Sequence, residues 1–338
     1  MNDFALTLLN WFRENGRELP WRETRDPYAI WLSEIILQQT QVKQGWSYWE
    51  RFMKHWPTVE ALAAASEDEV LREWQGLGYY SRARNLHFAA KQIVAMGGFP
   101  HTLDEIKTLK GVGDYTAAAI GSIAFGLPAA VVDGNVYRVL SRYFGVETPI
   151  NTTEGKKTFT ALAQSQLPEK EASAYNQAIM DFGAIQCTPQ SPQCDVCPLM
   201  ESCVAFRENR VGQLPVKLKT LKVKERHITY VYIRCDGYVA IHRRGAGDIW
   251  QGLYEPFLVE EDDKHVDVKQ CLLLKSNVRH VLTHRILLAD FYLYEPKERP
   301  FLGEEYIWVE ENELETYAVP RLVELMYEEV HAVLGNRK

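Results

Sequence analysis

The sequence predicts two domains of different class, an all-α domain followed by an α/β domain. Up to about residue 226 the apolar residues recur at helical spacing, and no earlier segment has the alternating pattern of a strand. Beyond that point the pattern alternates, and an amphipathic helix follows the last strand. At 338 residues the chain is long enough to bury two hydrophobic cores.

The all-α part begins with an amphipathic segment that places Phe4, Leu8 and Trp11 on one face. Capping residues and glycines divide the rest, and a Ser66/Glu69 capping box splits one long segment in two. We predict further helices over residues 29–39, 43–55, 58–75 in two pieces, 82–96, 103–110, 135–144, 153–166 and 172–186.

Residues 109–138 contain two helices joined by a glycine hairpin. A Thr102/Glu105 capping box begins a helix that is predicted to end at Lys110, and an alanine-rich helix begins at about Asp114. The intervening G-V-G lets the backbone approach another molecule closely, and free N–H groups at a helix start suit a phosphate. A helix–turn–helix that only packs against the core would have the same pattern.

Two carboxylates stand out. Glu34 lies within I-W-L-S-E-I-I-L, a run that is too apolar for an ordinary surface glutamate. Asp133 lies between Val132 and Gly134, where it is expected to cap the helix over 135–144. Either residue alone has a structural explanation, and both are candidates for chemistry.

Four cysteines fall within residues 187–203 at the spacing C-x6-C-x2-C-x5-C. Disulfides are not expected in a chain whose start lacks an export signal, so metal ligation is the stronger interpretation. Four thiolates suit either zinc or an iron–sulfur cluster, and the spacing alone slightly favours zinc.

Residues 207–226 form a basic strip, with seven Lys and Arg against two Glu, between two acidic parts of the chain. We interpret this strip as a linker, and it can also lie along a phosphate backbone. The predicted domains are therefore 1–206 and 227–338. In the second, strands are predicted over 227–235, 238–244, 253–260, 285–295 and 304–310, with a tight turn at Asp236-Gly237 and a helix over 319–334.

Six segments of the first 205 residues together resemble one family. They are WLSEIILQQTQV, GLGYYSRARNL, LKGVGDYTAAAIGSIAF, VVDGNVYRVLSR, NQAIMDFGAIQC and the four-cysteine spacing. The chain resembles the MutY-type adenine DNA glycosylases, which are helix-hairpin-helix/Gly-Pro-Asp base-excision glycosylases. Its second domain resembles their MutT-like, or Nudix-like, module. The resemblance implies a [4Fe–4S] cluster in place of zinc.

The resemblance implies that the protein removes adenine mispaired with 8-oxoguanine, or with guanine, after flipping the nucleotide out of double-stranded DNA. Glu34 matches the general acid of the family, and Asp133 matches the carboxylate that stabilises or attacks the oxocarbenium-like sugar. The resemblance also implies a monomeric protein of the bacterial cytoplasm, without a membrane partner.

Other roles follow residue by residue from the resemblance. Three residues match the family's adenine pocket: Arg22, Leu37 and Gln177. Tyr115 and Asn135 match the residues that support the sugar and Asp133. Gln39, Thr40 and Tyr79 match residues that meet the 8-oxoguanine or fill the disturbed base stack. The matched DNA-backbone contacts are Lys110, Gly111, Val112 and Gly113, and the matched cluster ligands are Cys187, Cys194, Cys197 and Cys203.

Tyr115 occupies the hairpin position where the related endonuclease III group has a lysine that forms a Schiff base and cleaves the strand. A glycosylase without strong lyase activity is therefore expected, although Lys110 stands where the family usually has proline. The alternatives are a bifunctional pyrimidine-lesion glycosylase/lyase and a non-catalytic iron–sulfur DNA-binding protein. The pairing of Glu34 with Asp133 in their motifs argues against the second alternative.

In the second domain, Thr283 and His284 fall where relatives carry the Ser and His of a loop that touches 8-oxoguanine, whereas Leu282 replaces the family's phenylalanine. The Nudix catalytic box R-E-x-x-E-E is missing from the sequence. The resemblance therefore implies a lesion-recognition module that does not hydrolyse nucleotides.

Overall fold

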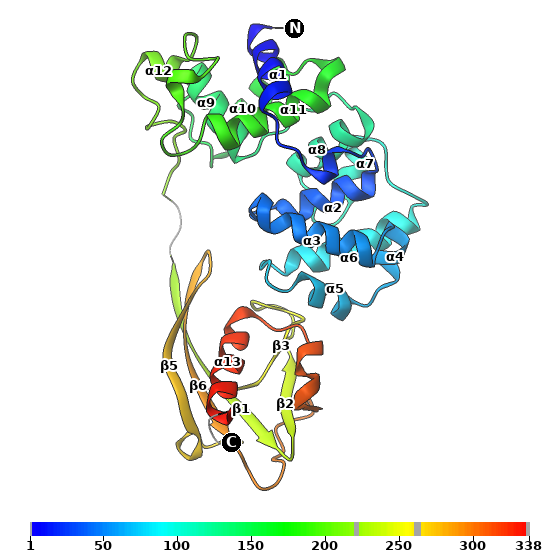
Figure 1. Cartoon of the computed structure of the whole chain (residues 1–338), viewed down its shortest axis with the longest axis vertical. Helices are drawn as coiled ribbons and strands as arrows, with labels where there is room; N and C mark the ends of the chain where they lie inside the picture. The colour runs from blue at the N-terminus through cyan, green and yellow to red at the C-terminus, as the bar shows by residue number, and fades with distance from the viewer. Residues whose placement is uncertain (1, 220–222, 260–264, 336–338) are drawn as a thin grey trace. The chain divides into compact units, whose positions relative to one another are not determined.

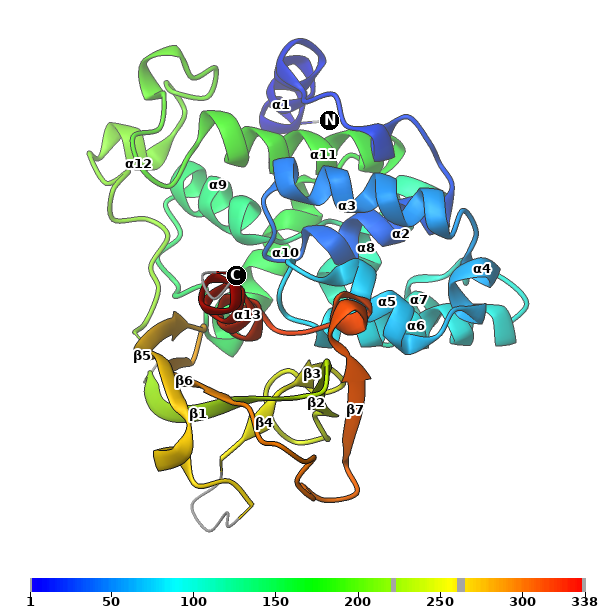
Figure 2. The same cartoon turned by 60° about the horizontal axis from the view of Figure 1, so that its bottom comes forward.

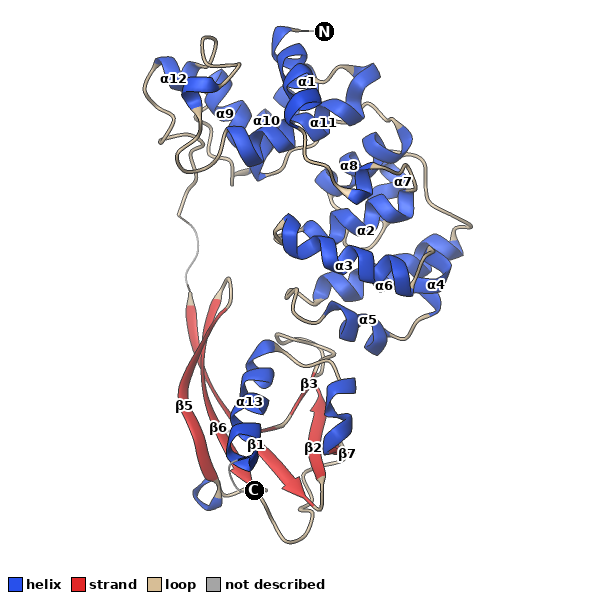
Figure 3. Ribbon diagram, viewed as in Figure 1, coloured by secondary structure: helices blue, strands red, loops and turns tan. Residues whose placement is uncertain are grey.

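The computed structural model describes residues 2–219, 223–259 and 265–335. The chain forms two compact units, Met1–Ala64 with Phe88–Lys219 and Ala65–His87 with Thr220–Lys338. Within the described residues the first unit contains helices and turns, and the strands lie in the second unit (Figure 3). The predicted order of fold classes is confirmed. The domain limits at 206 and 227 stay a prediction, and the chain leaves the first unit after Lys219.

The first unit is organised around helix α2 (Pro27–Leu37), which is buried on every face from Tyr28 to Ile36. An aspartate N-cap, Asp26, and a proline at its first position fix its start. It packs against α8 (Asp114–Phe125) and α3 (Val42–His55), which lie beside it in Figure 1. A helix that is apolar all round carries any polar residue it contains into the core.

A second group of helices packs around α11 (Ala172–Asp181), which contacts α1 (Asp3–Asn15), α8 and α9 (Gly134–Phe144). The shared core includes Leu8, Trp11 and Tyr175. At its end α11 continues as a π-helical turn, Phe182–Gln186, so the segment predicted over 172–186 is helical throughout but changes its winding.

The predicted helices agree with the observed ones to within two residues at each end, a difference typical of fraying helix termini. None of the described helices combines the length and apolarity needed to cross a bilayer. The remaining helices are α4 (Val59–Ala64), α5 (Glu67–Trp74), α6 (Ser81–Ala95), α7 (Leu103–Thr108), α10 (Thr153–Gln166) and α12 (Val204–Arg207).

Helices α7 and α8 form the expected helix-hairpin-helix. The Thr102/Glu105 capping box is present, with Thr102 Oγ1 accepting from Glu105 N at 3.3 Å. Helix α7 ends at Thr108, two residues before the predicted end at Lys110, because Leu109 N bonds back to Ile106 O and the chain then extends. Gly111 has a φ of 81°, which side chains disfavour, so the hairpin needs glycine there.

The second unit contains a seven-stranded sheet in the order β3-β2-β1-β6-β5, with β4 paired to β1 and β7 paired to β2. Strand β1 runs parallel to β6, and the other pairs are antiparallel (Figure 2). The strands are β1 (Lys224–Cys235), β2 (Tyr238–Arg243), β3 (Tyr254–Glu255), β4 (Phe257–Leu258), β5 (Leu272–Val281), β6 (Arg285–Tyr294) and β7 (Tyr306–Glu310).

Two strand predictions differ from the structure. The strand expected over 253–260 is divided into β3 and β4, which pair with different partners; residue 260 lies outside the described residues. Strand β5 was not predicted, because it is an edge strand whose burial does not alternate and whose register with β6 shifts twice. Asn277, with a φ of 53°, lies at the second irregularity.

Helix α13 (Arg321–Gly335) packs its apolar side, including Leu322, Met326 and Val330, into the core of the sheet. Helix α5 and the start of α6 belong to the same unit. Arg243 joins α5 to the sheet, with Nη2 at 2.9 Å from carboxylate oxygens of both Glu67 and Asp68. The GLGYYSRAR segment is therefore part of the second unit.

Candidate active site

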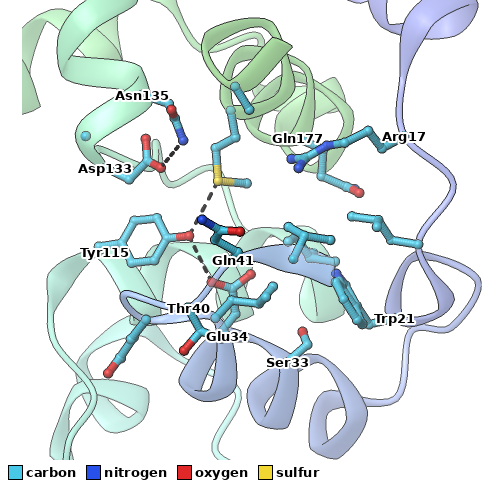
Figure 4. A pocket seen from close by; sticks show the side chains of 18 of the residues that line it. Arg17, Trp21, Ser33, Glu34, Thr40, Gln41, Tyr115, Asp133, Asn135 and Gln177 are labelled. Atoms are coloured by element: carbon cyan, nitrogen blue, oxygen red, sulfur yellow. Dashed lines mark hydrogen bonds between the residues drawn. The ribbon is translucent and has the colours of Figure 1, made fainter. Parts of the chain in front are cut away.

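A cavity of about 740 Å³ lies in the first unit, between α2, α8, α11 and the start of α9 (Figure 4). Side chains as far apart in the sequence as Arg17 and Ala184 meet there because α2 is packed between the other helices. Nine of the residues predicted from the sequence line this cavity: Arg22, Glu34, Leu37, Gln39, Thr40, Tyr115, Asp133, Asn135 and Gln177.

Glu34 projects from α2 into the cavity and is only 7% exposed. Burial raises the pKa of its carboxyl group to about 7, a hydrogen bond from Tyr115 lowers it, nearby Asp133 raises it, and Arg22 lowers it. A carboxyl group with such a pKa is partly protonated at neutral pH. It is therefore able to donate a proton to a bound molecule.

Tyr115, on the first turn of α8, touches Glu34 directly. Its hydroxyl donates to Glu34 Oε2 at 2.9 Å and also lies 3.5 Å from Met180 Sδ. Burial and the two nearby carboxylates raise the pKa of Tyr115 well above its ordinary value, so the phenol stays protonated. Figure 4 shows its hydroxyl lying between Glu34 and Asp133.

Asp133 is the N-cap of α9, as the sequence predicted. Its Oδ1 accepts from Val136 N at 2.8 Å, and its Oδ2 accepts from Asn135 Nδ2 at 2.8 Å. Burial raises the pKa of Asp133, and the hydrogen bonds from Val136 and Asn135 oppose that effect. The donors and the positive end of the helix stabilise the ionised form of this carboxylate inside an apolar setting.

Asn135 is held in place by Arg138, one turn along α9. Arg138 Nη2 donates to Asn135 Oδ1 at 2.8 Å and to the Gly183 carbonyl at 2.6 Å, and its Nε donates to the Cys187 carbonyl at 2.7 Å. Gly183 has no room for a side chain, since an added Cβ would lie 2.6 Å from the Cβ of Asn135. The backbone of the cysteine segment thus fixes the residue beside Asp133.

The sequence reasoning missed part of the cavity wall. Arg17, Trp21 and Met180 also line it, and the two arginines of the wall, Arg17 and Arg22, both bind Asp181. Arginines in a polar loop and an aspartate near a helix end give no sequence signal of a shared site, because more than 150 residues separate them. Only the packing of α1 against α11 brings them together.

The four cysteines line one apolar cavity, together with Val139, Tyr143 and Phe182. Burial raises the pKa of Cys194 and Cys203 and brings that of Cys197 to about 11, and the neighbouring thiols add to this effect. Bound metal would offset this cost by stabilising thiolates. Arg142 Nη1 lies 3.4 Å from Cys187 Sγ.

The four thiols form a donor set that suits a metal group. Within the described ranges, no three Cys, His, Asp or Glu side chains are grouped closely enough to hold one metal ion. Four thiols around one cavity are the donors that would hold an iron–sulfur cluster.

The hairpin residues lie outside the large cavity. Lys110, Gly111 and Gly113 are exposed, and Val112 is buried. Lys110 N donates to the side chain of Gln92, at 2.8 Å from Oε1. Lys110 does not line the cavity that contains Glu34.

Tyr79, Thr283 and His284 line a different cavity, of about 680 Å³, in the second unit. The hydroxyls of Tyr79 and Thr283 are hydrogen-bonded to each other. Trp250 and His280 lie on the wall of this cavity, with ring centroids 5.9 Å apart, and burial together with Arg321 lowers the pKa of His280. The predicted residues thus fall into two groups, one in each unit.

Comparison with protein families defines the class. Residues 32–165 match the HhH-GPD superfamily of base excision DNA repair proteins, residues 187–203 match the iron-sulfur binding domain of endonuclease III, and residues 229–329 match the NUDIX domain. The chain is therefore a helix-hairpin-helix glycosylase of base excision repair that carries an iron–sulfur loop and a Nudix-like second domain.

Curated relatives narrow the class. The adenine DNA glycosylase of Buchnera aphidicola subsp. Baizongia pistaciae is 33% identical over 86% of this chain and 84% of that protein, and the one of subsp. Acyrthosiphon pisum is 30% identical over 96% and 97%. The adenine DNA glycosylase of Homo sapiens is 43% identical over 62% of this chain and 41% of that protein. The chain belongs to the adenine DNA glycosylase family, whose cofactor is a [4Fe–4S] cluster.

Solved structures are similar to the helical part. A thermostable thymine-DNA glycosylase aligns with a TM-score of 0.57 at 32% identity, covering 61% of this chain and 95% of that one. An endonuclease III trapped covalently on DNA aligns with a TM-score of 0.54 at 25% identity, covering 61% and 94%. Glycosylases with different names therefore share this fold, and the fold alone does not identify the base that is removed.

Proposed function

We propose that this protein hydrolyses the N-glycosidic bond of adenine paired with 8-oxoguanine, or with guanine, in double-stranded DNA. The observation that carries the proposal is the buried pair Glu34 and Asp133, which line one cavity in a member of the adenine DNA glycosylase family. An adenine flipped out of the duplex would enter this cavity.

Glu34 acts as the general acid. Adenine leaves poorly unless one of its ring nitrogens is protonated, and Glu34 has a pKa near 7, so it still holds a proton at neutral pH. Tyr115, which donates to Oε2, leaves the other oxygen of the carboxyl group to carry that proton. The proton moves from Glu34 to the base, and the C–N bond breaks with its electrons going to adenine.

Asp133 stabilises or attacks the positive sugar that remains. Its two oxygens already accept from Val136 N and Asn135 Nδ2, which keeps the carboxylate oriented and ionised while the charge on the sugar develops. Tyr115 and Asn135 are supporting residues for the two carboxylates. The pair resembles the acid and the stabilising carboxylate of glycoside hydrolysis.

Base choice is assigned to the wall of the cavity. Arg22, Leu37 and Gln177 offer hydrogen-bond donors, an apolar surface and an amide, a set that suits the flat, polar-edged ring of adenine. Gln39 and Thr40 lie at the end of α2, where Gln39 has a φ of 59°, and we assign them to the opposite strand and the opened stack.

Strand cleavage is not expected. A Schiff base needs an amine within reach of the sugar, and none of the residues that line the cavity is a lysine. Lys110 lies in the exposed hairpin, where its charge and the free N–H groups of Gly111 and Gly113 suit a phosphate of the DNA backbone. Val112 is buried and anchors the hairpin between them.

We assign the cluster to Cys187, Cys194, Cys197 and Cys203, which share one cavity. When bound, the cluster supplies a rigid cross-link of the loop, with no step of base removal passing through it. Arg138 joins this loop to Asn135, so the loop helps to fix the position of Asp133.

Recognition of 8-oxoguanine is assigned to the second unit. Thr283 and His284 line its cavity with Tyr79 and the ring of Trp250, so hydroxyl, imidazole and aromatic groups meet in one place. We further propose a division into 1–206, a basic linker over 207–226 and a recognition domain over 227–338, acting as a monomer.

A cleavage assay on labelled duplexes tests the proposal. Duplexes containing 8-oxoguanine:A, G:A, G:T or thymine glycol are incubated with the protein, and strand breaks are counted with and without hot alkali. We expect breaks at adenine, only after alkali. Breaks without alkali would favour the bifunctional glycosylase/lyase. Release of thymine from the G:T duplex would favour a thymine-DNA glycosylase, the name of the similar solved structure. If no base is released from any duplex, the protein would be a non-catalytic DNA-binding protein.

A further inference from the structure

Asp181, at the end of α11, binds both arginines of the active-site wall from behind. Its side chain is 0% exposed. Its Oδ1 accepts from Arg17 Nε at 2.9 Å and from Arg22 Nη2 at 2.8 Å, while Oδ2 accepts from Arg17 N at 2.9 Å and from Arg22 Nη1 at 2.8 Å. Burial would raise the pKa of Asp181, but these donors outweigh it and keep the carboxylate ionised.

These contacts determine where Arg22 lies. Arg22 Nη1 also donates to the Arg17 carbonyl at 2.7 Å, and its guanidinium lies 5.3 Å from the centroid of the Phe12 ring. The side chain is only 15% exposed. Because its partners all lie on the protein side, Arg22 is oriented before any substrate enters the cavity.

The same helix presents a second wall residue to the cavity. Gln177 precedes Asp181 by four positions on α11, so the two side chains project from the same side of the helix. Helix α11 therefore fixes both Gln177 and, through Asp181, Arg22.

The charge of Arg22 acts on Glu34. The charged and titratable groups that face Glu34 are Tyr115 from α8, Asp133 from the start of α9, and Arg22 from the turn Pro20–Arg22. Arg22 favours the ionised form of Glu34, which is the form that has no proton to donate. An arginine in the cavity wall can bind a base, but its positive charge lowers the pKa of Glu34 unless a nearby negative charge balances it.

Resting on the proposed excision of adenine, we propose that Asp181 is a positioning residue of this reaction. It fixes Arg22 against the wall of the cavity and balances its charge in front of Glu34. The wall can then donate hydrogen bonds to a base without removing the proton of the acid.

The test is the pH profile of single-turnover adenine release by the full-length protein with its cluster. In Asp181→Asn the charge of Arg22 is no longer balanced, so the alkaline midpoint should fall by about one pH unit. The variant should then be at least several-fold slower than wild type at pH 8 but close to it at pH 5. Asp181→Glu, which keeps the charge, should restore the wild-type midpoint.

Arg22→Gln should move the midpoint in the opposite direction, because it removes the cation that opposes protonation of Glu34. The matched control is Glu147→Gln, which breaks an exposed carboxylate–arginine pair with Arg210 and should leave the midpoint unchanged. Helical circular dichroism and the absorbance of the cluster establish that each variant is folded.

The inference is overturned if folded Asp181→Asn has a wild-type or a raised midpoint. If Asp181→Asn does not fold, Arg22→Gln decides, and an unchanged midpoint in that variant overturns the inference. Wild-type protein that releases no adenine would instead contradict the proposed function itself, so the two failures are distinct.

Discussion

The hydroxyl of Tyr115 donates a hydrogen bond of 2.9 Å to Glu34, although the two residues are 81 positions apart in the chain. Tyr115 occupies the position where a lyase would need the amine of a lysine. In this protein its hydroxyl contacts the proposed general acid, Glu34. Burial pushes the pKa of Glu34 up and the tyrosine pulls it down, and the balance lies at about 7. Tyr115, on the first turn of α8, thus tunes the pKa of the acid on α2.

Glu34→Gln should abolish adenine release while leaving binding to an 8-oxoguanine:A duplex within a few-fold of wild type. The substitution removes the proton and preserves the shape of the side chain. Single-turnover excision and a binding titration measure the two effects separately. Excision at the wild-type rate would contradict the assignment of Glu34 as general acid.

The excision rate should decline as the pH rises through about 7. Glu34 must be protonated to act, and the protonated fraction falls above its pKa of about 7. Asp133 must be ionised, and because burial raises its pKa, a second decline in the excision rate is expected on the acid side.

Tyr115→Phe removes a hydrogen bond that lowers the pKa of Glu34, so the alkaline midpoint of the excision rate should lie higher in this variant than in wild type. A lower midpoint in that variant would contradict the role given to the hydroxyl.

Glu34 should also make the fold less stable at alkaline pH. Its pKa in the folded state, about 7, exceeds the value of about 4.3 expected in an unfolded chain. The stability that goes with this raised pKa is fully present below about pH 4 and is lost as the pH rises through 7. The loss is at most about 4 kcal/mol by pH 8. Glu34→Gln cannot ionise, so its melting temperature should exceed that of wild type more at pH 8 than at pH 5. An equal difference at both pH values would rule out this coupling.

The sequence predicted the helices, and it singled out Glu34 and Asp133, because those features carry local signals. The other seven of the nine cavity residues came from the resemblance to the glycosylase family. Capping boxes, the apolar run around Glu34 and the G-V-G hairpin are each contained within a few residues. Asp181 and Arg17 have no such signal, since their pairing depends on α1 packing against α11. Strand β5 escaped prediction for a related reason: its irregular pairing with β6 breaks the period that identifies a strand.

Purified protein should contain about four irons per chain and absorb broadly in the visible range. Cys203→Ser should lower the iron content and the yield of soluble protein, because one of four ligands in the shared cavity is lost. Cys235→Ser, a buried cysteine of β1, is the control and should retain full iron content. One zinc per chain without iron would contradict the cluster assignment.

The preference for 8-oxoguanine:A over G:A should depend on Thr283 and His284. Both line the cavity of the second unit, and Thr283 is bonded to Tyr79 in the DNA-free protein, so a bound lesion would have to replace that partner. Each hydrogen bond that only the oxidised base can satisfy is worth about 1–3 kcal/mol, so the double variant Thr283→Ala/His284→Ala should lose most of the discrimination.

Point variants are preferable to truncation, since residues 65–87 belong to the same compact unit as residues 220–338. Thr316→Ala removes an exposed hydroxyl of that unit, one bonded to the Glu313 carbonyl, and should leave the ratio unchanged. If the double variant still separates the two mispairs as wild type does, Thr283 and His284 do not read the lesion.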